Sequence, residues 1–330
     1  MAILVTSGAG YIGSVVVDDL IANGETVGVI DDLSRGQRAA VNEKAVFYEG
    51  GIGDSSLVAK IIGELDVTAV MHFSAYAYVG ESVEKPHLYY QNNVIETVKL
   101  LDTMNRCGAK QIVFSSSCAT FGEPERVPIE EYHPQRPTNP YGRTKLIVEQ
   151  ILGDYDRAYG LRSVALRYFN ACGATETRGE LHDPETHLIP LILDAAAGKI
   201  DRLSVFGGDY PTPDGTAVRD YIHVSDLSDA HIRAVKHLAN GGASGSFNLG
   251  NGKGFSVLEV IEAAKRVTGR DVPYKIEPRR PGDPSQLVAG AEKAQNILGW
   301  RPRHTELESM IESAWRWRSS SEESSAKSVR

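Results

Sequence analysis

The chain has 330 residues, a net charge of −8 and 42% hydrophobic side chains, a composition typical of a globular protein that excludes wholesale disorder. Its sequence pI is near 5.6 and it has no long Lys/Arg run, which argues against a protein that binds duplex nucleic acid through its phosphates. The length fits either one large α/β unit or two domains that share a cleft.

Targeting and cysteine patterns indicate a cytoplasmic protein. The first ten residues have no basic segment followed by a long apolar one, so we expect no secretory signal. The apolar run Leu188–Leu193 is far shorter than the roughly 20 residues of a membrane span, so we expect no membrane partner. Cys107, Cys118 and Cys172 are odd in number and widely separated, which predicts reduced thiols, no disulfide framework and no metal site.

In the first half, short β-rich runs alternate with helical stretches, which predicts an α/β fold with a doubly wound, Rossmann-like parallel sheet. The helical stretches carry apolar residues at mixed three and four spacing, as crossover helices do. In chain order we expect strand Ala2–Thr6, helix Ile12–Ala22, strand Val27–Ile30, strand Ala45–Glu49, helix Ser55–Leu65, strand Ala69–Phe73, helix Lys85–Met104, strand Gln111–Ser115, helix Tyr141–Tyr159 and strand Ser163–Arg167.

The texture changes from about Asn170, where Gly, Pro, Asp and Thr crowd residues 173–187 and 207–216 and predict shorter elements and longer loops. We expect a cofactor-binding domain over residues 1–170, with some later segments returning to it, and a smaller α/β substrate lobe over residues 171–318. Residues 319–330 are rich in Ser and Glu and are predicted to be a disordered tail, because they cannot bury enough apolar surface.

The first motif is a glycine loop between a predicted strand and a predicted helix. Gly8, Gly10 and Gly13 fit G-x-G-x-x-G, in which the glycines let the backbone turn tightly and approach a pyrophosphate at the helix N-terminus. Asp31 ends the second strand, where its carboxylate can accept hydrogen bonds from an adenosine ribose and repel a 2′-phosphate. The motif therefore predicts NAD in preference to NADP, and a glycine-rich turn without a ligand is the simpler alternative.

A second constellation combines a Tyr/Lys pair with a run of serines. Tyr141 and Lys145 are four residues apart, so on a helix they project from the same face. Ser117 ends the run Phe114-Ser115-Ser116-Ser117 at the carboxyl end of a strand, the edge at which doubly wound sheets bind ligands. Separately, these features also suit a surface Tyr/Lys pair and a turn-capping serine. Together with a dinucleotide loop they predict a site that handles a substrate hydroxyl.

The chemistry of these groups follows from their pKa values. A phenol ordinarily titrates near pH 10, so Tyr141 is a poor base unless a cation such as Lys145 or oxidised nicotinamide stabilises its phenolate. Tyr141 could then remove an alcohol proton while NAD takes the hydride from the same carbon. Ser117 would hydrogen-bond the same oxygen and align it.

From Ala2 to about Arg303 the sequence resembles the extended short-chain dehydrogenase/reductase family, and within it the enzymes that epimerise UDP-hexoses. The resemblance rests on an ordered series of motifs and not on one of them. Besides the loop, Ser117, Tyr141 and Lys145, the series comprises His72-Phe73-Ser74-Ala75, Val79-Gly80-Glu81-Ser82, Asn92-Asn93-Val94, Leu166-Arg167-Tyr168-Phe169-Asn170, Pro184-Glu185-Thr186-His187-Leu188-Ile189-Pro190, Asp209-Tyr210-Pro211-Thr212, Arg219-Asp220-Tyr221-Ile222-His223-Val224, Phe247-Asn248-Leu249-Gly250 and Arg279-Arg280-Pro281-Gly282-Asp283.

The resemblance implies NAD-dependent epimerisation at C4 of UDP-galactose and UDP-glucose through a transient 4-keto sugar. It implies that Ser117, Tyr141 and Lys145 are catalytic. The cofactor residues that it implies are Gly8, Gly10, Tyr11, Ile12, Gly13, Asp31, Phe73, Asn92, Tyr141, Lys145 and Tyr168. The UDP-sugar residues are Ser117, Asn170, His187, Leu188, Ser204, Phe206, Arg219, Arg280 and Asp283. Asn170 and the arginines would hold the diphosphate, Phe206 the uracil and Asp283 the ribose, although the arginines also suit surface ion pairs.

The sequence departs from the family pattern at several positions. Ser7 stands where the loop usually begins with glycine, and Gly51 where an aspartate commonly meets the adenine amine. Ala77 replaces a frequent lysine, which leaves Lys145 as the main nearby cation. Leu287 matches the position that gates C2-acetamido sugars, and Gly290 replaces a common aspartate, so acceptance of N-acetyl sugars stays open.

Alternative functions remain. Cys118 and Ala119 follow Ser117 where nucleotide-sugar dehydratases carry an Asp-Glu pair, so the chain offers no carboxyl pair for eliminating water. A UDP-glucuronate or UDP-pentose 4-epimerase and a non-catalytic NAD sensor are the two other candidates. The family likeness also implies a homodimer through helices Lys85–Met104 and Tyr141–Tyr159, whose apolar stripes could instead cover only their own sheet.

Overall fold

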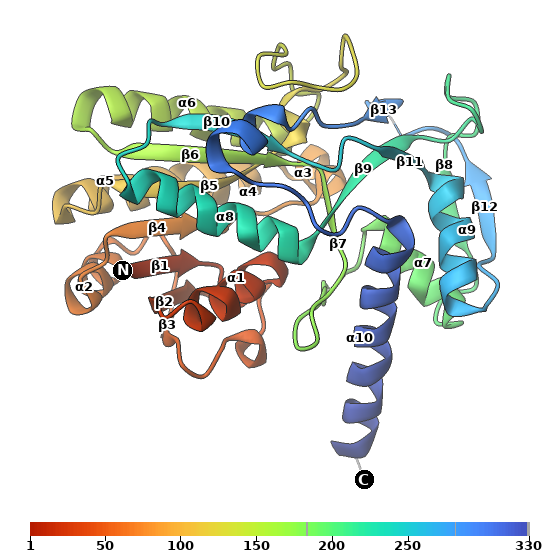
Figure 1. The fold of residues 1–330 in the computed structure, drawn as a ribbon, viewed down its shortest axis with the longest axis horizontal. Coiled ribbons are helices and arrows are strands. Elements are labelled where there is room, and N and C mark those ends of the chain that lie inside the picture. The colour runs from red at the N-terminus through yellow and green to blue at the C-terminus, as the bar shows by residue number, and fades with distance from the viewer. Residues whose placement is uncertain (183, 281, 329–330) are drawn as a thin grey trace.

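Seven parallel strands form the central sheet of the first lobe (Figure 1), in the order β10-β6-β5-β4-β1-β2-β3. The computed structural model describes residues 1–182, 184–280 and 282–328, and side chains as far as Ser320. The strands are β1 (Ala2–Thr6), β2 (Thr26–Asp31), β3 (Val46–Glu49), β4 (Ala69–His72), β5 (Gln111–Ser117), β6 (Arg162–Tyr168) and β10 (Gly245–Leu249). The predicted doubly wound parallel sheet is confirmed, and its six predicted strands lie within two residues of their expected bounds.

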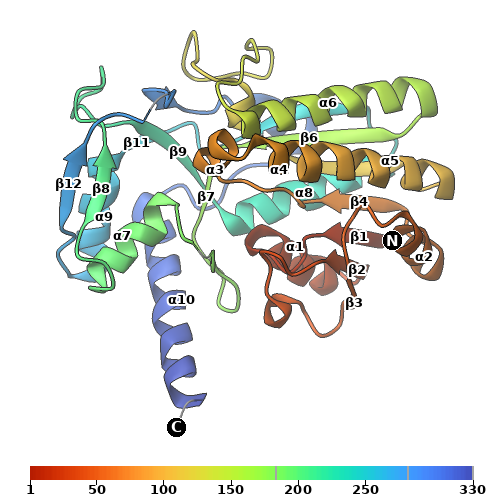
Figure 2. The same ribbon diagram turned by 180° about the vertical axis from the view of Figure 1, so that it is seen from behind.

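Helices cover both faces of this sheet, because side chains alternate along each strand. Ile3 and Val5 of β1 pack toward α1 (Tyr11–Ala22) and α8 (Val224–Ala239). Leu4 packs toward the opposite layer of α2 (Ser55–Leu65), α5 (Glu96–Cys107) and α6 (Pro140–Tyr159), which Figure 2 shows from behind. All three β1 side chains are fully buried, and each such burial contributes about 1.5–3 kcal/mol.

The predicted helix Lys85–Met104 is divided in the structure. It comprises α4 (Pro86–Tyr89), a π-helical turn at Tyr90–Ile95, and α5, and α3 (Val79–Glu84) precedes it. The prediction of one continuous helix is wrong. A π-helical turn changes the spacing of apolar residues only slightly, so the periodicity of the sequence does not reveal it.

The second lobe is built on smaller sheets to the right of the first in Figure 1. β8 (Leu203–Phe206) pairs with β12 (Tyr274–Glu277), and β9 (Val218–His223) pairs with β7 (Asn170–Cys172), β11 (Gly254–Ser256) and β13 (Gln286–Leu287). Its helices are α7 (Leu188–Ala196), α9 (Val257–Thr268) and α10 (Leu307–Ser328). Short turns of 3-10 helix lie at Arg38–Ala40 and Cys118–Thr120, and a π turn lies at Ala294–Leu298.

The end of the chain continues α10 to Ser328, beyond residue 318, where we expected regular structure to stop. Adding a residue to an existing helix is much easier than starting one, and Ser, Glu, Ala and Lys are compatible with a helix even without burial. Residues 329 and 330 lie outside the described part of the chain. Among the described helices, none is long and apolar enough to cross a membrane.

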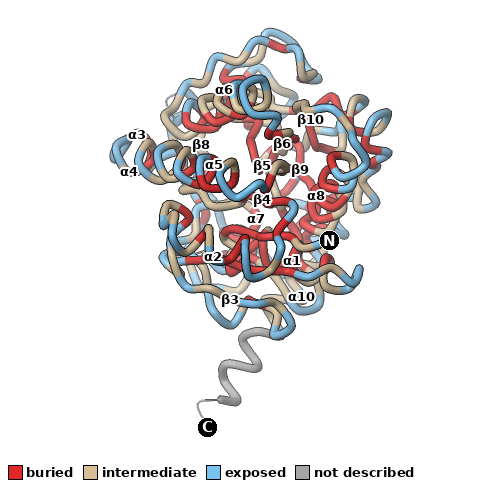
Figure 3. The backbone as a smooth tube through the Cα atoms, turned by 90° about the vertical axis from the view of Figure 1, so that its left-hand side faces the viewer, coloured by how far each residue is buried: buried red, intermediate tan, exposed pale blue. Residues whose placement is uncertain are grey.

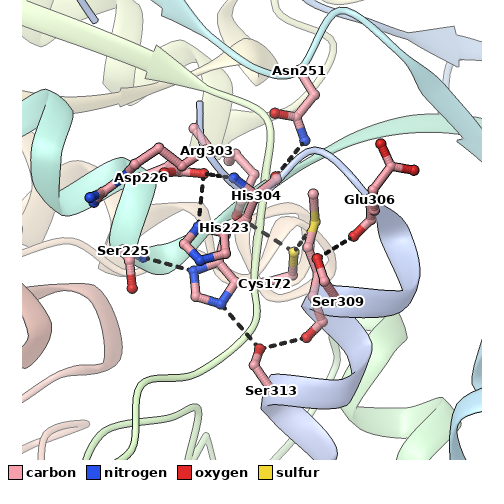
Figure 4. A network of polar contacts seen from close by, with 12 residues as sticks. Cys172, His223, Ser225, Asp226, Asn251, Arg303, His304, Glu306, Ser309 and Ser313 are labelled. Atoms are coloured by element: carbon pink, nitrogen blue, oxygen red, sulfur yellow. Dashed lines mark hydrogen bonds and ion pairs between the residues drawn. The ribbon is translucent and has the colours of Figure 1, made fainter. Parts of the chain in front are cut away.

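A polar network ties α10 to β9 and α8 (Figure 4). The rings of His223 and His304 stack with centroids 4.1 Å apart. The backbone N–H of His304 donates to the buried carboxylate of Asp226 at 2.9 Å, and His223 Nε2 lies 3.1 Å from Ser313 Oγ in α10. These contacts fix the second lobe relative to the sheet, so the site between the lobes has a defined geometry.

The strands' carboxyl ends all point toward the second lobe (Figures 1 and 2). Figure 3 shows the buried backbone concentrated in the strands and α8, with exposed residues on the outer helices and loops. The residues that follow β1, β4, β5 and β6 therefore meet at one edge of the sheet, facing the second lobe.

Candidate active site

The loop between β1 and α1 leaves the first turn of that helix open to an anion. Gly10 is the N-cap of α1 and supplies no capping side chain, and the first turn contains no acidic residue. A Cβ on Gly13 would lie 2.3 Å from the carbonyl oxygen of Ser7, so only glycine fits there. The unpaired N–H groups and the helix dipole together suit a pyrophosphate.

Ser7 adopts a left-handed backbone conformation, with φ of 56°. Its N–H donates to the Ile30 carbonyl at 2.9 Å, and its carbonyl accepts from Gly10 N at 3.1 Å. Neighbouring hydrogen bonds therefore impose a conformation that costs an L-residue about 1–2 kcal/mol. The sequence departure at Ser7 is thus a strained residue inside an otherwise preserved turn.

Asp31 ends β2 beside this loop and is buried, with 5% of the residue exposed. Oδ2 accepts from Ala9 N at 3.0 Å and Oδ1 accepts from Leu33 N at 2.9 Å. Burial raises the pKa of Asp31, and these backbone N–H groups oppose the rise. Each oxygen keeps a further lone pair, so the carboxylate is fixed in place and still able to accept from a ribose hydroxyl.

Gly142 allows α6 to approach the turn that follows β5. Asn139 caps α6 by accepting from Gly142 N at 2.9 Å, and Tyr141 occupies the first turn of the helix. A Cβ on Gly142 would lie 2.2 Å from the Ala119 carbonyl oxygen. This close approach brings the helix that carries Tyr141 against the end of β5, where Ser117 lies.

Lys145 is buried one helical turn after Tyr141, with 3% of its surface exposed. Its Nζ donates to the Ser115 carbonyl at 2.7 Å and lies 5.8 Å from the centroid of the Tyr141 ring. Burial lowers the pKa of Lys145 to about 7, and the Glu149 carboxylate acts in the opposite direction. The spacing of Tyr141 and Lys145 thus does place both groups at the carboxyl edge of β5.

The phenol of Tyr141 is strongly desolvated. Burial raises its pKa well above the ordinary value of a phenol, and a hydrogen bond with Ser117 acts to lower it. Ser117 Oγ also accepts from Ala119 N at 3.2 Å, which orients the hydroxyl. The structure therefore brings Ser117, Tyr141 and Lys145 together, and a phenolate at this position needs additional positive charge to form near neutral pH.

The π-helical turn places amide side chains against the loop that follows β4. Asn93 Oδ1 accepts from Tyr76 N at 2.8 Å, and Asn93 Nδ2 donates to the Tyr76 carbonyl at 3.0 Å and to Thr144 Oγ1 at 3.2 Å. The neighbouring Asn92 donates to Asn93 at 3.0 Å. This bracing joins the loop to α6 beside Tyr141. Asn93 is part of the sequence motif Asn92-Asn93-Val94, but its bracing role depends on the π-helical turn, which the motif does not predict.

Two other cofactor candidates lie at the same sheet edge. Phe73 directly follows β4, and its ring centroid lies 4.6 Å from that of His231 in α8. Tyr168 ends β6 and is the register partner of Ser117, and burial raises its pKa to about 12. His231 was not expected from the sequence, yet its Nε2 lies 3.0 Å from Ser115 Oγ, so it packs directly behind the catalytic candidates.

The substrate candidates form pairs in the second lobe. Arg219 donates to Asp283 at 2.5 Å, and the Arg280 guanidinium lies 4.0 Å from the centroid of the Phe206 ring. Asn170 Nδ2 donates to the Asp220 carbonyl at 3.2 Å, beside Arg219 in β9. The remaining candidates belong to none of these pairs: Ser204 is exposed in β8, two residues before Phe206, His187 is the N-cap of α7, and Leu188 is the first residue of that helix.

A cluster of two glutamates and two histidines surrounds His187. His182 Nδ1 and His187 Nδ1 each lie 2.8 Å from Glu180 Oε1, and His187 Nδ1 lies 2.9 Å from Glu185 Oε1. Burial disfavours the charged form of His187, but the two carboxylates outweigh it and raise its pKa to about 10. Only His187 was singled out from the sequence, although the alternation of Glu and His over residues 180–187 was a visible signal.

Comparison with known proteins identifies the family. Residues 3–250 match the NAD dependent epimerase/dehydratase family. The chain belongs to this family. Among curated members, it is 53% identical over 319 residues to UDP-glucose 4-epimerase of Halalkalibacterium halodurans, with 96% of this chain and 95% of that protein aligned.

Solved structures of this epimerase/dehydratase family match the fold across nearly the whole chain. UDP-glucose 4-epimerase from Brucella ovis in complex with NAD gives a TM-score of 0.93 at 49% identity, covering 95% of this chain and 97% of that one. The enzyme from Bifidobacterium longum in complex with NAD⁺ and UDP gives a TM-score of 0.91 at 37% identity, covering 97% and 98%. The resemblance inferred from the ordered motifs is thus confirmed.

Proposed function

We propose that this protein is an NAD-dependent UDP-glucose 4-epimerase, which interconverts UDP-galactose and UDP-glucose at C4 of the hexose. The observation that carries the proposal is the meeting of Ser117, Tyr141 and Lys145 at the edge of the sheet onto which the glycine loop opens. Relatives about 50% identical over nearly the whole chain, which are UDP-glucose 4-epimerases, support the same reaction.

The chain's residues fit NAD. The open first turn of α1 suits the pyrophosphate, and Asp31 can accept from the adenosine ribose while its charge disfavours a 2′-phosphate. Phe73, Asn92 and Tyr168 follow or face strand ends at the sheet edge, where the nicotinamide half would lie. When bound, NAD supplies the reversible acceptor of the C4 hydride.

Proton transfer falls to Tyr141. Its phenolate oxygen would accept the proton from the sugar 4-hydroxyl in one direction, and the phenol so formed would return the proton in the other, as microscopic reversibility requires. The Lys145 ammonium would stabilise the phenolate electrostatically, and Ser117 would donate to the same sugar oxygen. Oxidised NAD held by the residues above would add a positive charge in this site, which would help to offset the desolvation that raises the pKa of Tyr141.

The UDP moiety would be held by the second lobe. Arg219 and Arg280 offer planar, paired donors for the diphosphate, Phe206 an aromatic face for uracil, and Asp283 an acceptor for the uridine ribose. Arg219 and Asp283 pair with each other in the structure. On binding of the nucleotide, Arg219 would turn to the diphosphate and Asp283 to the ribose, so this ion pair would separate. Asn170 and the cluster at His187 complete the candidate set.

Leu287 bears on the choice of sugar. It lies in β13, partly buried against an apolar cluster that includes Phe121 and Phe169. A leucine there contributes no polar atom to the pocket, so we expect no hydrogen bond from this position to the sugar.

We further propose that the protein is a cytoplasmic homodimer, assembled through α5 and α6, without nucleic-acid or membrane partners. Two large apolar side chains on these elements remain exposed, Ile95 at the end of the π-helical turn before α5 and Tyr159 at the end of α6, which supports an interface that involves these helices. Light scattering should give twice the mass of the 35.9 kDa chain; the monomer mass would contradict the dimer.

The test of function is conversion of UDP-galactose to UDP-glucose by the purified protein, without added reductant. UDP-N-acetylgalactosamine, UDP-glucuronate and UDP-xylose serve as parallel substrates. We expect conversion of UDP-galactose without net consumption of NAD. Binding of NAD with no turnover of any of the four would contradict an epimerase and favour a sensor.

A further inference from the structure

Glu149 is a buried carboxylate on the same helix face as the catalytic candidates. It lies one turn of α6 beyond Lys145, and its side chain is 7% exposed. Its carboxylate pairs side-on with one edge of the Arg167 guanidinium from β6, with Nε at 3.0 Å from Oε1 and Nη2 at 2.5 Å from Oε2. Arg167 is equally buried, so this is an interior ion pair.

Further contacts orient the carboxylate toward β5. Ser116 Oγ donates to Glu149 Oε1 at 2.5 Å, and Gln135 Nε2 donates to Oε2 at 3.2 Å. The Arg167 guanidinium is itself anchored through Nη1 to the Glu131 carbonyl at 3.1 Å. Ser116 lies between Ser115, whose carbonyl accepts from Lys145, and Ser117. The end of β5 therefore carries hydrogen-bond partners of both the Lys145 ammonium and the Glu149 carboxylate.

Lys145 needs such an anion, because a buried ammonium is costly unless it is compensated. Its Nζ has the Ser115 carbonyl as hydrogen-bond acceptor. Of the titratable and charged groups around it, His72 from β4 is buried with its pKa lowered to about 3, and Tyr141 on α6 is uncharged when protonated. Arg167 from β6 is a second cation. Glu149 is the carboxylate that acts on Lys145 to favour its charged form.

We propose that Glu149 is a positioning residue that acts through Lys145, keeping the ammonium charged in the epimerase site. Arg167 and Ser116 hold the carboxylate in place for this purpose. The proposal rests on the function proposed above, in which charged Lys145 stabilises the Tyr141 phenolate. The competing interpretation is a purely structural Glu149–Arg167 pair, which would support the fold and leave the titration of Lys145 unchanged.

Three variants separate charge from structure. Glu149→Gln removes the negative charge and leaves the buried Arg167 guanidinium without its counter-charge, which destabilises the fold. The double variant Glu149→Gln with Arg167→Gln removes both charges, so it restores pairing between neutral groups and keeps the test informative if the single variant fails to fold. Glu149→Asp keeps the charge and is shorter by one methylene.

Two readouts are needed, both on the holoenzyme. The first is the pH dependence of kcat for UDP-galactose, and the second is the titration of Lys145 followed by NMR with ¹³C at lysine Cε. Loss of a neighbouring opposite charge should lower the Lys145 titration midpoint by about 1 pH unit or more. The alkaline limb of the kcat profile should move to lower pH with it, because the ammonium is then lost earlier as pH rises.

The control is Asp194→Asn, which removes a comparably buried carboxylate, 13% exposed, that pairs with Arg318 in the second lobe. We expect this variant and Glu149→Asp to leave the Lys145 titration midpoint and the alkaline limb of the kcat profile unchanged. A folded Glu149→Gln protein whose Lys145 midpoint and alkaline limb match those of the unaltered protein would overturn the proposal, as would a double variant that matches Arg167→Gln alone. The NMR titration does not need turnover, so absence of epimerase activity in the unaltered chain would refute the proposed function separately.

Discussion

Gly142 gives the sharpest test of how the catalytic candidates are brought together. A Cβ at this position would lie 2.2 Å from the Ala119 carbonyl oxygen, where ordinary contact begins at 3.4 Å, and it would also lie 3.1 Å from Pro137 Cβ. To admit alanine, α6 must therefore withdraw from the turn after β5 by about 1 Å. Such a shift carries Tyr141 and Lys145 away from Ser117, which does not move with the helix.

The expected cost follows from that displacement. Misplacing a reacting group by about 1 Å lowers the rate by about 100-fold, and overpacking destabilises a fold by about 1–3 kcal/mol. We therefore expect Gly142→Ala to remain folded, with kcat for UDP-galactose reduced by about two orders of magnitude. The assay is steady-state conversion to UDP-glucose, with urea unfolding measured on the same preparation.

Gly153 on the same helix supplies the matched control. A Cβ there would have only the Arg157 Nη1 atom at 3.6 Å as its nearest neighbour, so alanine fits without movement. Gly153→Ala should keep the activity and raise the free energy of unfolding by about 0.5–1 kcal/mol, because alanine favours the helix. A folded Gly142→Ala protein with unaltered kcat would show that the close approach of α6 to Ala119 does not set the geometry of the site.

Three further predictions follow from other residues. Ser7→Gly should raise the free energy of unfolding by about 0.5–1 kcal/mol in urea titrations, because relief of left-handed strain exceeds the added flexibility of glycine in the unfolded chain; no gain would mean that Ser7 is unstrained. Asp31 should make NAD bind more tightly than NADP by calorimetry, and equal affinities would contradict its predicted role. The partner carboxylates of His187 raise its pKa from 6.5 to about 10, so the stability that its charged form contributes should be fully present below pH 6.5 and lost as pH rises through about 10. The difference in the free energy of unfolding between the unaltered protein and His187→Gln should therefore shrink over that pH window. A difference independent of pH would contradict the ion-paired cluster.

The sequence predicted most of the first lobe, because its elements carry local signals. Strand Ala2–Thr6 and helix Ser55–Leu65 have the bounds that alternation and amphipathic spacing indicate. The Tyr141/Lys145 spacing and the serines ending β5 likewise needed only a helix and a strand edge to become neighbours. What they share is that each depends on a few residues close together in the chain.

The remainder depends on contacts between distant segments, which no local pattern encodes. β10 joins the central sheet from the second half of the chain. The π-helical turn at Tyr90–Ile95 goes with contacts between Asn93 and the Tyr76 backbone, which the sequence pattern does not indicate. Nothing in the segment Tyr141–Lys145 marks Gly142 as special, because its role depends on the Ala119 carbonyl that packs against it. The Glu180 cluster and the Glu149–Arg167 pair also depend on the fold, because it is burial that makes their charged side chains interact strongly.

Replacement of Tyr141 by phenylalanine tests the central claim most directly, since it deletes one hydroxyl and keeps the ring. Measured on protein that retains stoichiometric NAD and an unaltered melting temperature, Tyr141→Phe should interconvert UDP-galactose and UDP-glucose more slowly by orders of magnitude. Turnover near that of the unaltered protein would mean that another group moves the proton of the sugar hydroxyl.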